Sequence, residues 1–378
     1  MNNFIPVNSP LIKEREKELI IQCLDSGWIS SEGPFVSEFE DKFSKKVNRK
    51  FGIACSSGTA ALDIAMAALN IGPGDEVIIP AFTIISCASA VYKTGAKIVL
   101  VDCDQYSWNV NPEEVCNAIN EKTKAILLVH IYGLPVDIDP IIKVAKSKKI
   151  AIIEDAAEQI GGEYKGKPCG SFGDISTFSF YPNKHITTGE GGMIVTNEFD
   201  LSEKCKSLRN LCFKAGDRFV HEELGWNYRM TNLQAALGLA QLERLEESIE
   251  KKREIGNYYY QELKNLSLIQ LPIKKLDYAR NIFWVFAIVL SPKLGNAKNF
   301  MEKMRLKNIG TRPFFYPIHK QPVFKKFGYF KNDMHPNSEF IYKQGLYLPS
   351  GLNLKFEEID RVVKVIKELC NLDKKNYV

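Results

Sequence analysis

Short apolar runs alternate with amphipathic helical patterns through the first half of the chain, and this alternation constrains the fold most. The apolar runs, rich in branched side chains, span residues 76–80, 97–101, 125–130 and 150–154. The helical patterns span residues 60–69, 86–93, 112–120 and 139–147. Strands that alternate with helices form parallel sheets with helices on both faces. We therefore expect an α/β fold with a mostly parallel central sheet.

Two further apolar runs, residues 175–180 and 192–196, are expected to be strands of the same sheet. The residues between them are polar and glycine-rich, without a helical pattern. We expect a non-helical connection to interrupt the regular order of the sheet at this point.

The remaining patterns indicate a second, smaller domain behind a connecting helix. The expected elements are helices 13–24 and 35–47, one long helix 232–263, a strand 283–290, a helix 297–307, a proline-rich loop 311–323 and a terminal helix 356–370. We divide the chain into a large domain, residues 1–250 with the N-terminal segment included, and a small C-terminal α+β domain, residues 251–378.

The composition argues against several classes of protein. The chain of 378 residues has a formal net charge of +5 and no block of Lys and Arg, so no nucleic-acid or membrane partner is expected. Its nine cysteines include no CxxC pair, so neither a disulfide framework nor a metal site is expected. No secretory signal pattern and no bilayer-length apolar run is visible. The expectation is a cytoplasmic protein.

Small and hydroxyl residues lead into an alanine-rich helical pattern at residues 55–62. The amides at a helix N-terminus lack partners and attract anions, and glycine lets a phosphate approach the backbone. Gly58 and Thr59 are therefore candidates for phosphate binding. The alternative is that Ser57 or Thr59 only caps the helix. No GxGxxG or GxxxxGK[ST] motif is present, which argues against a dinucleotide or P-loop site.

Two acids follow the apolar run at residues 150–154. Asp155 ends the run, and Glu158 would face the same site if a helical turn begins at Asp155. Ligands gather at the carboxyl ends of parallel strands, and a carboxylate there can keep a pyridine nitrogen protonated, which makes the ring an electron sink. The alternative is that Asp155 only caps the next turn.

Lys184 lies between an aromatic strand and a glycine-rich turn and has no charged neighbour in sequence. Partial burial would lower its pKa, as a lysine that forms a Schiff base requires. His185 is a candidate ligand or base, although a structural role is the commoner one for such a histidine. We call the helix start at Gly58 and Thr59 the phosphate cup. The phosphate cup, the strand end at Asp155 and Lys184 together indicate a cofactor site far more specifically than any one of them.

Several segments resemble the sugar-nucleotide aminotransferases of the DegT/DnrJ/StrS family, within the fold-type I group of pyridoxal phosphate enzymes. The resemblance covers nearly the whole chain. Its segments are residues 27–31, 57–62, 72–78, 154–158, 178–180, the stretch around Lys184, and 225–232. It implies that pyridoxal 5'-phosphate is the cofactor and that the chain is an aminotransferase.

The resemblance also implies a role for each matching residue. Lys184 would form the Schiff base and shuttle the proton, while Asp155 would hold the pyridinium nitrogen and Glu158 would lie near the ring hydroxyl. The phosphate would be held by the amides of Gly58 and Thr59 and the hydroxyl of Ser179. Asn227 would reach the cofactor phosphate of a neighbouring subunit, which implies a homodimer with shared active sites.

The implied substrates are glutamate and the C4 keto group of a nucleotide-linked 4-keto-6-deoxy sugar. Pyridoxamine 5'-phosphate would carry the amino group between them, and the product would serve lipopolysaccharide O-antigen biosynthesis. Trp28, Arg312 and His319 are candidates for contacting the nucleotide sugar, although a structural role fits Arg312 or His319 equally well. Whether the nucleotide is GDP, UDP or dTDP stays open.

One position departs from the family pattern. Relatives carry an aromatic residue directly after the threonine that corresponds to Thr83, stacked on the cofactor ring, whereas this chain has Ile84 there and its aromatic residue at Phe82. An aliphatic side chain still packs on a ring but loses offset stacking.

Two other functions remain open at this point. A pyridoxamine-dependent sugar 3-dehydratase of the same fold would carry histidine in place of Lys184, and His185 is adjacent. A ligand-binding protein of this fold without catalysis is the other alternative, and the joint presence of Lys184, Asp155 and Ser179 argues against it.

Overall fold

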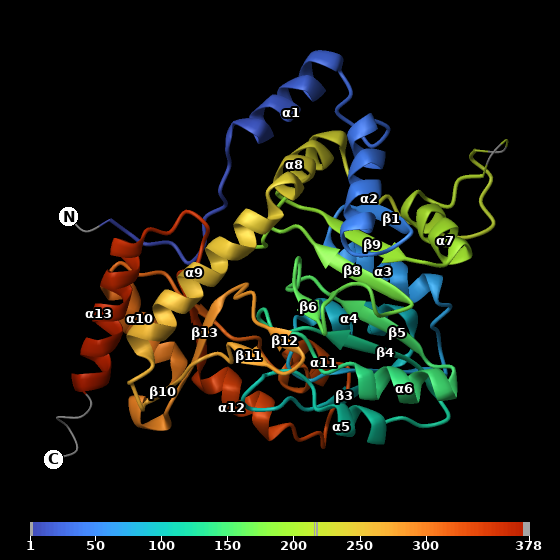
Figure 1. The fold of residues 1–378 in the computed structure, drawn as a ribbon. Coiled ribbons are helices and arrows are strands. Elements are labelled where there is room, and N and C mark those ends of the chain that lie inside the picture. Colours follow the sequence, from blue (N-terminus) through green and yellow to red (C-terminus); the bar gives the residue numbers. More distant parts are fainter. Residues whose placement is uncertain (1–2, 215, 217, 373–378) are drawn as a thin grey trace.

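The computed structural model describes residues 3–214, 216 and 218–372, and its described part contains a large and a small sheet (Figure 1). The large sheet has seven strands in the order β1-β9-β8-β5-β4-β2-β3. These strands are β1 (Phe51–Cys55), β2 (Glu76–Pro80), β3 (Lys97–Val101), β4 (Thr123–Val129), β5 (Ala151–Asp155), β8 (Ile175–Ser179) and β9 (Gly192–Thr196). From β8 to β3 all neighbours are parallel, and β9 is antiparallel to both β8 and β1. The expected α/β fold with a mostly parallel sheet is confirmed.

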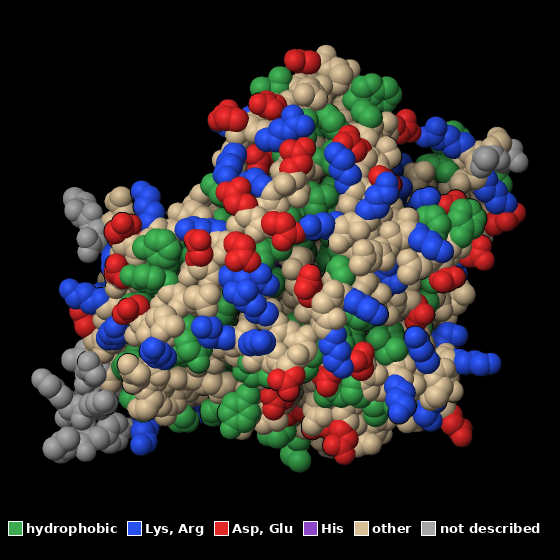
Figure 2. Space-filling view, in the orientation of Figure 1, with side chains coloured by type: hydrophobic (Ala, Val, Ile, Leu, Met, Phe, Trp, Pro, Cys, Tyr) green, Lys and Arg blue, Asp and Glu red, His purple; other side chains and the backbone are tan. Residues whose placement is uncertain are grey.

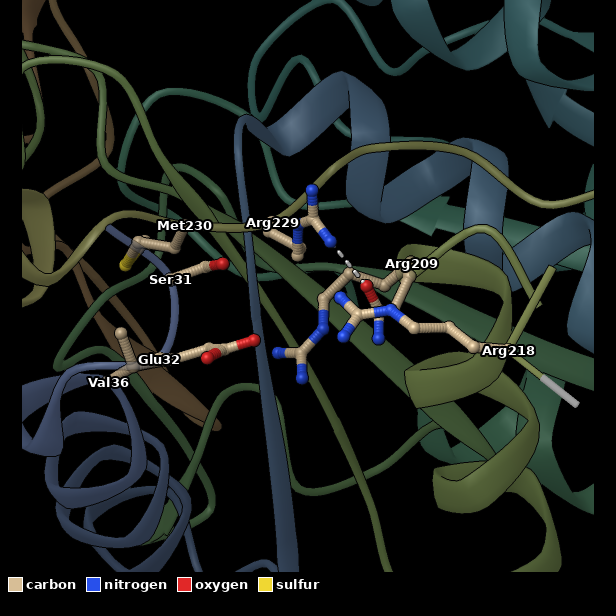
Figure 3. A pocket seen from close by; sticks show the side chains of 8 residues that line it. Ser31, Glu32, Val36, Arg209, Arg218, Arg229 and Met230 are labelled. Carbon is tan, nitrogen blue, oxygen red and sulfur yellow. Dashed lines mark hydrogen bonds between the residues drawn. The ribbon is translucent and has the colours of Figure 1, made fainter. Parts of the chain in front are cut away.

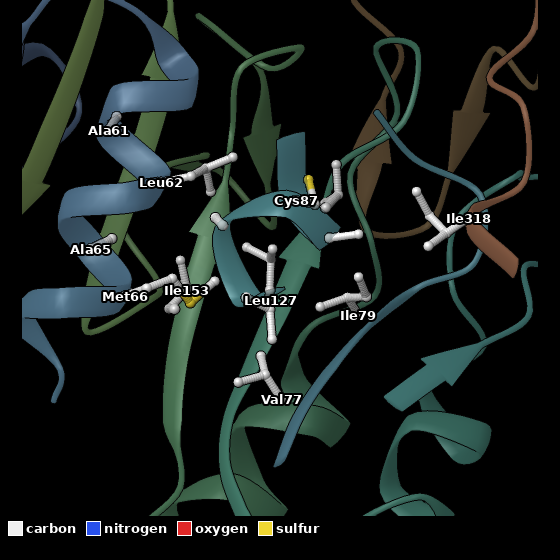
Figure 4. Packing of buried hydrophobic residues seen from close by; sticks show 14 of the residues in the cluster. Ala61, Leu62, Ala65, Met66, Val77, Ile79, Cys87, Leu127, Ile153 and Ile318 are labelled. Carbon is white, nitrogen blue, oxygen red and sulfur yellow. The ribbon is translucent and has the colours of Figure 1, made fainter. Parts of the chain in front are cut away.

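Helices cover both faces of the large sheet. They are α2 (Pro34–Lys46), α3 (Gly58–Ala68), α4 (Ile85–Thr94), α5 (Pro112–Asn117), α6 (Asp139–Lys148), α7 (Phe199–Arg209) and α8 (Asn232–Glu243), and α1 (Glu14–Ser26) packs on α8 (Figure 1). Alternate strand residues point to opposite faces. Leu127 and Ile153 join Met66 of α3 in one core (Figure 4). Ile126 and Ile152 belong to the core on the other face.

The small sheet is antiparallel, with the strand order β10-β13-β15-β14. Its strands are β10 (Ile269–Gln270), β13 (Phe286–Leu290), β14 (Arg312–Pro313) and β15 (Gly345–Leu348). The helices around it are α9 (Leu245–Leu263), α10 (Ala297–Leu306), α11 (Pro322–Lys326), α12 (Pro336–Gln344) and α13 (Phe356–Leu372), with the short 3-10 helices η1 (Pro292–Leu294) and η2 (Ile318–Lys320). Two ribbons of two strands complete the fold: β6 (Glu163–Tyr164) with β7 (Lys167–Pro168), and β11 (Lys275–Leu276) with β12 (Ala279–Arg280).

The prediction of one long helix over residues 232–263 is wrong. Arg244 has φ −118° and ψ 25°, which is not helical, so the segment is divided into α8 and α9. The Arg244 guanidinium pairs with the buried Glu16 carboxylate of α1 at 2.5 Å, a tertiary contact that compensates for the break. The strand expected from residue 283 begins at Phe286, because Phe283 has a left-handed backbone (φ 49°).

The division of the chain into residues 1–250 and 251–378 stays a prediction. The boundary falls inside α9, which begins against the core of the large sheet at Leu245 and ends against the core of the small sheet at Leu263. The N-terminal segment also reaches beyond this boundary, since Ile5 forms a parallel bridge with Ile309.

Charged side chains of both signs are interspersed over the face drawn in Figure 2. That distribution agrees with the small net charge of the chain. Among the described residues, no helix has the length and apolar character that crossing a membrane demands.

Candidate active site

A cavity of about 380 Å³ lies where strands of the large sheet end beside the small sheet. The strand register aligns Val129 with Asp155 and Asp155 with Thr177, so the carboxyl ends of β4, β5 and β8 meet at one edge. The structure brings seven of the predicted site residues to this cavity: Gly58, Thr59, Asp155, Glu158, Ser179, Lys184 and Arg312.

The N-terminus of α3 opens onto the cavity. The Ser57 hydroxyl caps the helix by accepting the Ala60 amide at 3.0 Å, so the capping alternative holds for Ser57. The first-turn amides of Gly58 and Thr59 lie outside the α-helical bonding pattern, which leaves them suited to an anion. A Cβ on Gly58 would lie 2.7 Å from the Cβ of Ser179, so only glycine permits this approach of helix and strand.

Asp155 is buried at the end of β5. Its carboxylate accepts the Ala157 amide at 3.0 Å and lies 3.6 Å from the Cys87 thiol that donates to it. Burial raises the pKa of Asp155, while the Ala157 amide and the cation of Lys184 oppose the rise. A buried carboxylate of this kind is stabilised in its charged form when a cation sits beside it, and a protonated pyridine nitrogen is such a cation.

Lys184 is almost completely buried, and its environment differs from that of a surface lysine. Its Nζ lies 3.9 Å from Oε1 of Glu158, and both side chains are less than a tenth exposed. Burial lowers the pKa of Lys184, against the opposing influence of Glu158 and Asp155, and burial raises the pKa of Glu158. The other oxygen of Glu158 is held by the Tyr132 amide at 2.7 Å.

Trp284 is a site residue that the sequence pattern did not reveal. Lys184 Nζ lies 3.8 Å from the centre of a Trp284 ring, and the indole N–H donates to the Asn183 carbonyl at 2.8 Å. The residue sits inside an ordinary apolar run and lies a hundred positions beyond Lys184, so no local pattern points to it. Tyr347 of β15 also lines the cavity and was not predicted.

Ile84 occupies the position at which the family resemblance implies an aromatic residue. Ile84 lines the cavity and is 43% exposed. Phe82 is fully buried and packs against Tyr132, Phe314 and Phe315, away from the lining. Phe82 is therefore not placed to substitute for the missing aromatic residue.

Two histidines from the sequence analysis do not line the cavity. His185 is buried with Nε2 3.4 Å from the Ile282 carbonyl, and burial lowers its pKa to about 3. His319 is buried beside His335 and pairs with Glu339 at 3.0 Å. These surroundings favour a structural role for both residues, and the substrate contact of His319 stays a prediction.

A second hollow, lined by three arginines, lies beside Asn227. It has a volume of about 100 Å³, and Figure 3 shows the guanidinium groups of Arg209, Arg218 and Arg229 close together on it. Arg229 donates to Asn210 at 2.6 Å, and Asn210 forms a bridge with Asn227. Asn227 does not line the main cavity of its own chain.

Trp28 also lies outside the main cavity. Its side chain is 51% exposed, and its carbonyl accepts the Asn232 side-chain amide at 2.7 Å. The substrate contact of Trp28 stays a prediction. The role of Asn227, which depends on a second subunit, stays one as well.

Pyridoxal phosphate fits the donor set around the main cavity. The N-terminus of α3 at Gly58 and Thr59, the buried Asp155 carboxylate and the almost fully buried Lys184 all line this cavity. A helix N-terminus suits a phosphate, a buried carboxylate suits a cation, and a lysine with a lowered pKa suits Schiff-base formation. The fold and this site define a pyridoxal phosphate-dependent aminotransferase.

The chain belongs to the DegT/DnrJ/EryC1/StrS aminotransferase family, whose model matches residues 10–367. It is 40% identical to GDP-perosamine synthase of Escherichia coli O157:H7 over 365 residues, which cover 97% of this chain and 98% of the relative. It superposes on Spr1654 from Streptococcus pneumoniae in the PMP form with a TM-score of 0.92, 25% identity and coverage of 98% and 99% of the two chains. The GDP-4-keto-6-deoxymannose-3-dehydratase ColD, solved as a mutant with bound GDP-perosamine, gives a TM-score of 0.89, 26% identity, and coverage of 96% of this chain and 100% of that chain.

Proposed function

We propose that this enzyme transfers the amino group of glutamate to the C4 keto group of GDP-4-keto-6-deoxymannose and so forms GDP-perosamine. The observation that carries the proposal is the buried Lys184 beside the Glu158 carboxylate, in a chain 40% identical over its length to a GDP-perosamine synthase. A relative of the same fold named for GDP-4-keto-6-deoxymannose, with GDP-perosamine bound, supports the same nucleotide sugar. The alternative substrates are UDP- or dTDP-linked 4-keto-6-deoxy sugars.

When bound, pyridoxal phosphate supplies an electron sink for the carbon that loses its proton. Asp155 keeps the proton on the pyridine nitrogen because its buried carboxylate is stabilised by that cation. Lys184 Nζ removes and returns the proton at the reacting carbon, and burial helps this step because a lowered pKa leaves more of the amine neutral. The amides of Gly58 and Thr59 and the Ser179 hydroxyl hold the phosphate.

We also propose that the active site is shared across a homodimer. Asn227 and the hollow of Arg209, Arg218 and Arg229 would then face the neighbouring subunit's cavity. Arginines recognise phosphate oxygens through parallel hydrogen bonds. Arg209 is already paired with Glu40, and Glu32 also lines the hollow, so Arg218 and Arg229 are the residues proposed to meet the diphosphate of a nucleotide sugar or the cofactor phosphate. Trp28 would lie on the same side, while Arg312 contacts the substrate from within its own chain.

The location and pathway are further parts of the proposal. Nine free cysteines support a reducing, cytoplasmic compartment. A role in lipopolysaccharide O-antigen biosynthesis is what the family resemblance implies for an amino sugar of this kind.

The test is a panel of GDP-, UDP- and dTDP-linked 4-keto-6-deoxy sugars incubated with the enzyme, pyridoxal phosphate and glutamate, with product masses recorded. We expect amination of the GDP sugar with release of 2-oxoglutarate, and no product from a Lys184→Ala variant. Loss of water from the sugar without amination would instead identify a 3-dehydratase. If only a UDP or dTDP sugar is aminated, the nucleotide assignment is wrong while the reaction type stands.

A further inference from the structure

Lys252 of α9 is a buried charged residue that no step of the proposed reaction uses. Its side chain is 2% exposed, and Nζ donates to the Trp284 carbonyl at 2.7 Å and to the Ser350 carbonyl at 2.5 Å. Burial lowers the pKa of Lys252 to about 7. The Lys252 amine has two N–H donors when neutral and three when protonated, so both carbonyls have a donor in either state.

The Trp284 carbonyl is one end of a chain of contacts that leads to Lys184. The indole ring of Trp284 faces Lys184 Nζ at 3.8 Å, and its N–H binds the carbonyl of Asn183, the residue before Lys184. Lys252 thus binds the backbone of Trp284, and the side chain of Trp284 binds the loop that carries Lys184.

Helix α9 packs closely against the segments that contain Trp284 and Ser350. A Cβ on Gly256, one helical turn beyond Lys252, would lie 2.4 Å from the Phe283 ring. The Tyr259 hydroxyl on the same helix donates to the Pro349 carbonyl at 2.9 Å. Lys252, Gly256 and Tyr259 therefore fix α9 against the two segments that flank Trp284 and Ser350.

We propose that Lys252 is a positioning residue that holds the Trp284 ring against Lys184. The inference rests on the proposed role of Lys184 as the lysine that binds the cofactor. An aromatic face stabilises a nearby cation, so a firmly held Trp284 favours the protonated form of nitrogen at Lys184. Removing Lys252 leaves two buried carbonyls without their donor, and the backbone at Trp284, two residues before β13, relaxes away from Lys184.

The test compares Lys252→Met, Trp284→Leu and the double variant, each saturated with pyridoxal phosphate. The pKa of the linkage between cofactor and Lys184 is read from the pH dependence of visible absorption. We expect Trp284→Leu to lower it by about half a unit to one unit. Lys252→Met should lower it in the same direction, and the double variant should fall no further than Trp284→Leu, because both changes act through one ring.

Lys251→Met is the matched control, since Lys251 is the neighbouring lysine of α9 and pairs with Glu254 near the surface. We expect it to leave the absorption titration unchanged. If Lys252→Met does not fold, Lys252→Gln retains two N–H donors on a shorter side chain, and a smaller shift in the same direction supports the proposal.

Two results separate this proposal from the proposed function. A wild-type protein that shows no visible cofactor band at all contradicts the role of Lys184 and the positioning role with it. The other result has three parts: the wild-type protein titrates normally, Trp284→Leu shifts the pKa, and the folded Lys252 variants titrate like Lys251→Met. That result overturns the role of Lys252 alone. Additive shifts in the double variant also overturn it.

Discussion

Replacing Glu154 by glutamine removes the most heavily hydrogen-bonded carboxylate beneath the site. Glu154 lies one position before Asp155 and is fully buried. Five groups bind its two oxygens: the amides of Gly170, Phe172 and Gly173, the Ser176 hydroxyl, and the His130 ring at 3.0 Å. These contacts hold its pKa at about 2 although burial alone would raise it.

The size of the effect follows from this pKa. The ordinary value is 4.5 and the folded value about 2, and each unit of pKa corresponds to about 1.4 kcal/mol, so the charged form contributes roughly 3 kcal/mol to folding. Glutamine has the shape of glutamate, but its NH2 group replaces one of the accepting oxygens. At least one of the five donors then loses its acceptor, which costs about 1–3 kcal/mol. We expect Glu154→Gln to lower the free energy of unfolding by roughly 3 kcal/mol at pH 7.

Urea unfolding followed by circular dichroism measures this loss, with Glu163→Gln as the control, because Glu163 is the exposed residue of β6. Because the folded pKa lies below the unfolded one, the stabilisation is present above about pH 4.5 and is lost as the pH falls toward 2. The difference between wild type and variant should stay constant from neutral pH down to about 5 and shrink below that. A difference at pH 7 that is no larger than that of the control, or one that grows as the pH falls, refutes the reasoning.

Three further predictions concern the cofactor site directly. Gly58→Ala should weaken pyridoxal phosphate binding at least about tenfold in a titration of visible absorption, because its Cβ would displace Ser179 from the phosphate position; unchanged affinity contradicts the phosphate assignment. Ile84→Phe should preserve or tighten cofactor binding, because Ile84 lines the cavity and a ring there restores stacking; a loss of binding shows that the cofactor ring does not lie against this position. Mixing inactive Lys184→Ala and Asn227→Ala subunits should restore activity in the rate assay. In a dimer with shared sites, one of the two sites would take its Lys184 and its Asn227 from the unchanged positions of the two subunits. No recovery of activity argues against a shared active site.

The main chemistry of the site was predictable because local sequence patterns carry it. The boundaries predicted for the strands 76–80, 97–101 and 192–196 match β2, β3 and β9. The cup at Gly58, the strand end at Asp155 and the loop at Lys184 each follow a strand of the same sheet, and parallel strands place their carboxyl ends together. The strands before Asp155 and Lys184 were predicted, so sequence order sufficed to bring these two residues together, whereas the strand before Gly58 was not predicted.

Features that depend on distant contacts were missed. Arg244 has a good helix propensity, so nothing local predicts the break between α8 and α9, and its Glu16 partner is 228 positions away. Trp284 reaches the site only because the small sheet packs beside the Lys184 loop. The strand β1 was overlooked because its apolar run is short and includes Gly52, although its place directly before the phosphate cup was a usable signal.

The central claim, that Lys184 carries the cofactor, is tested most directly by reducing the full-length protein with borohydride in the presence of pyridoxal phosphate and mapping the modified peptide by mass spectrometry. We expect a phosphopyridoxyl group on Lys184 and no modification of that peptide in a Lys184→Ala variant. Modification of a different lysine, or an unmodified Lys184 peptide in a protein that retains the yellow cofactor, would contradict it.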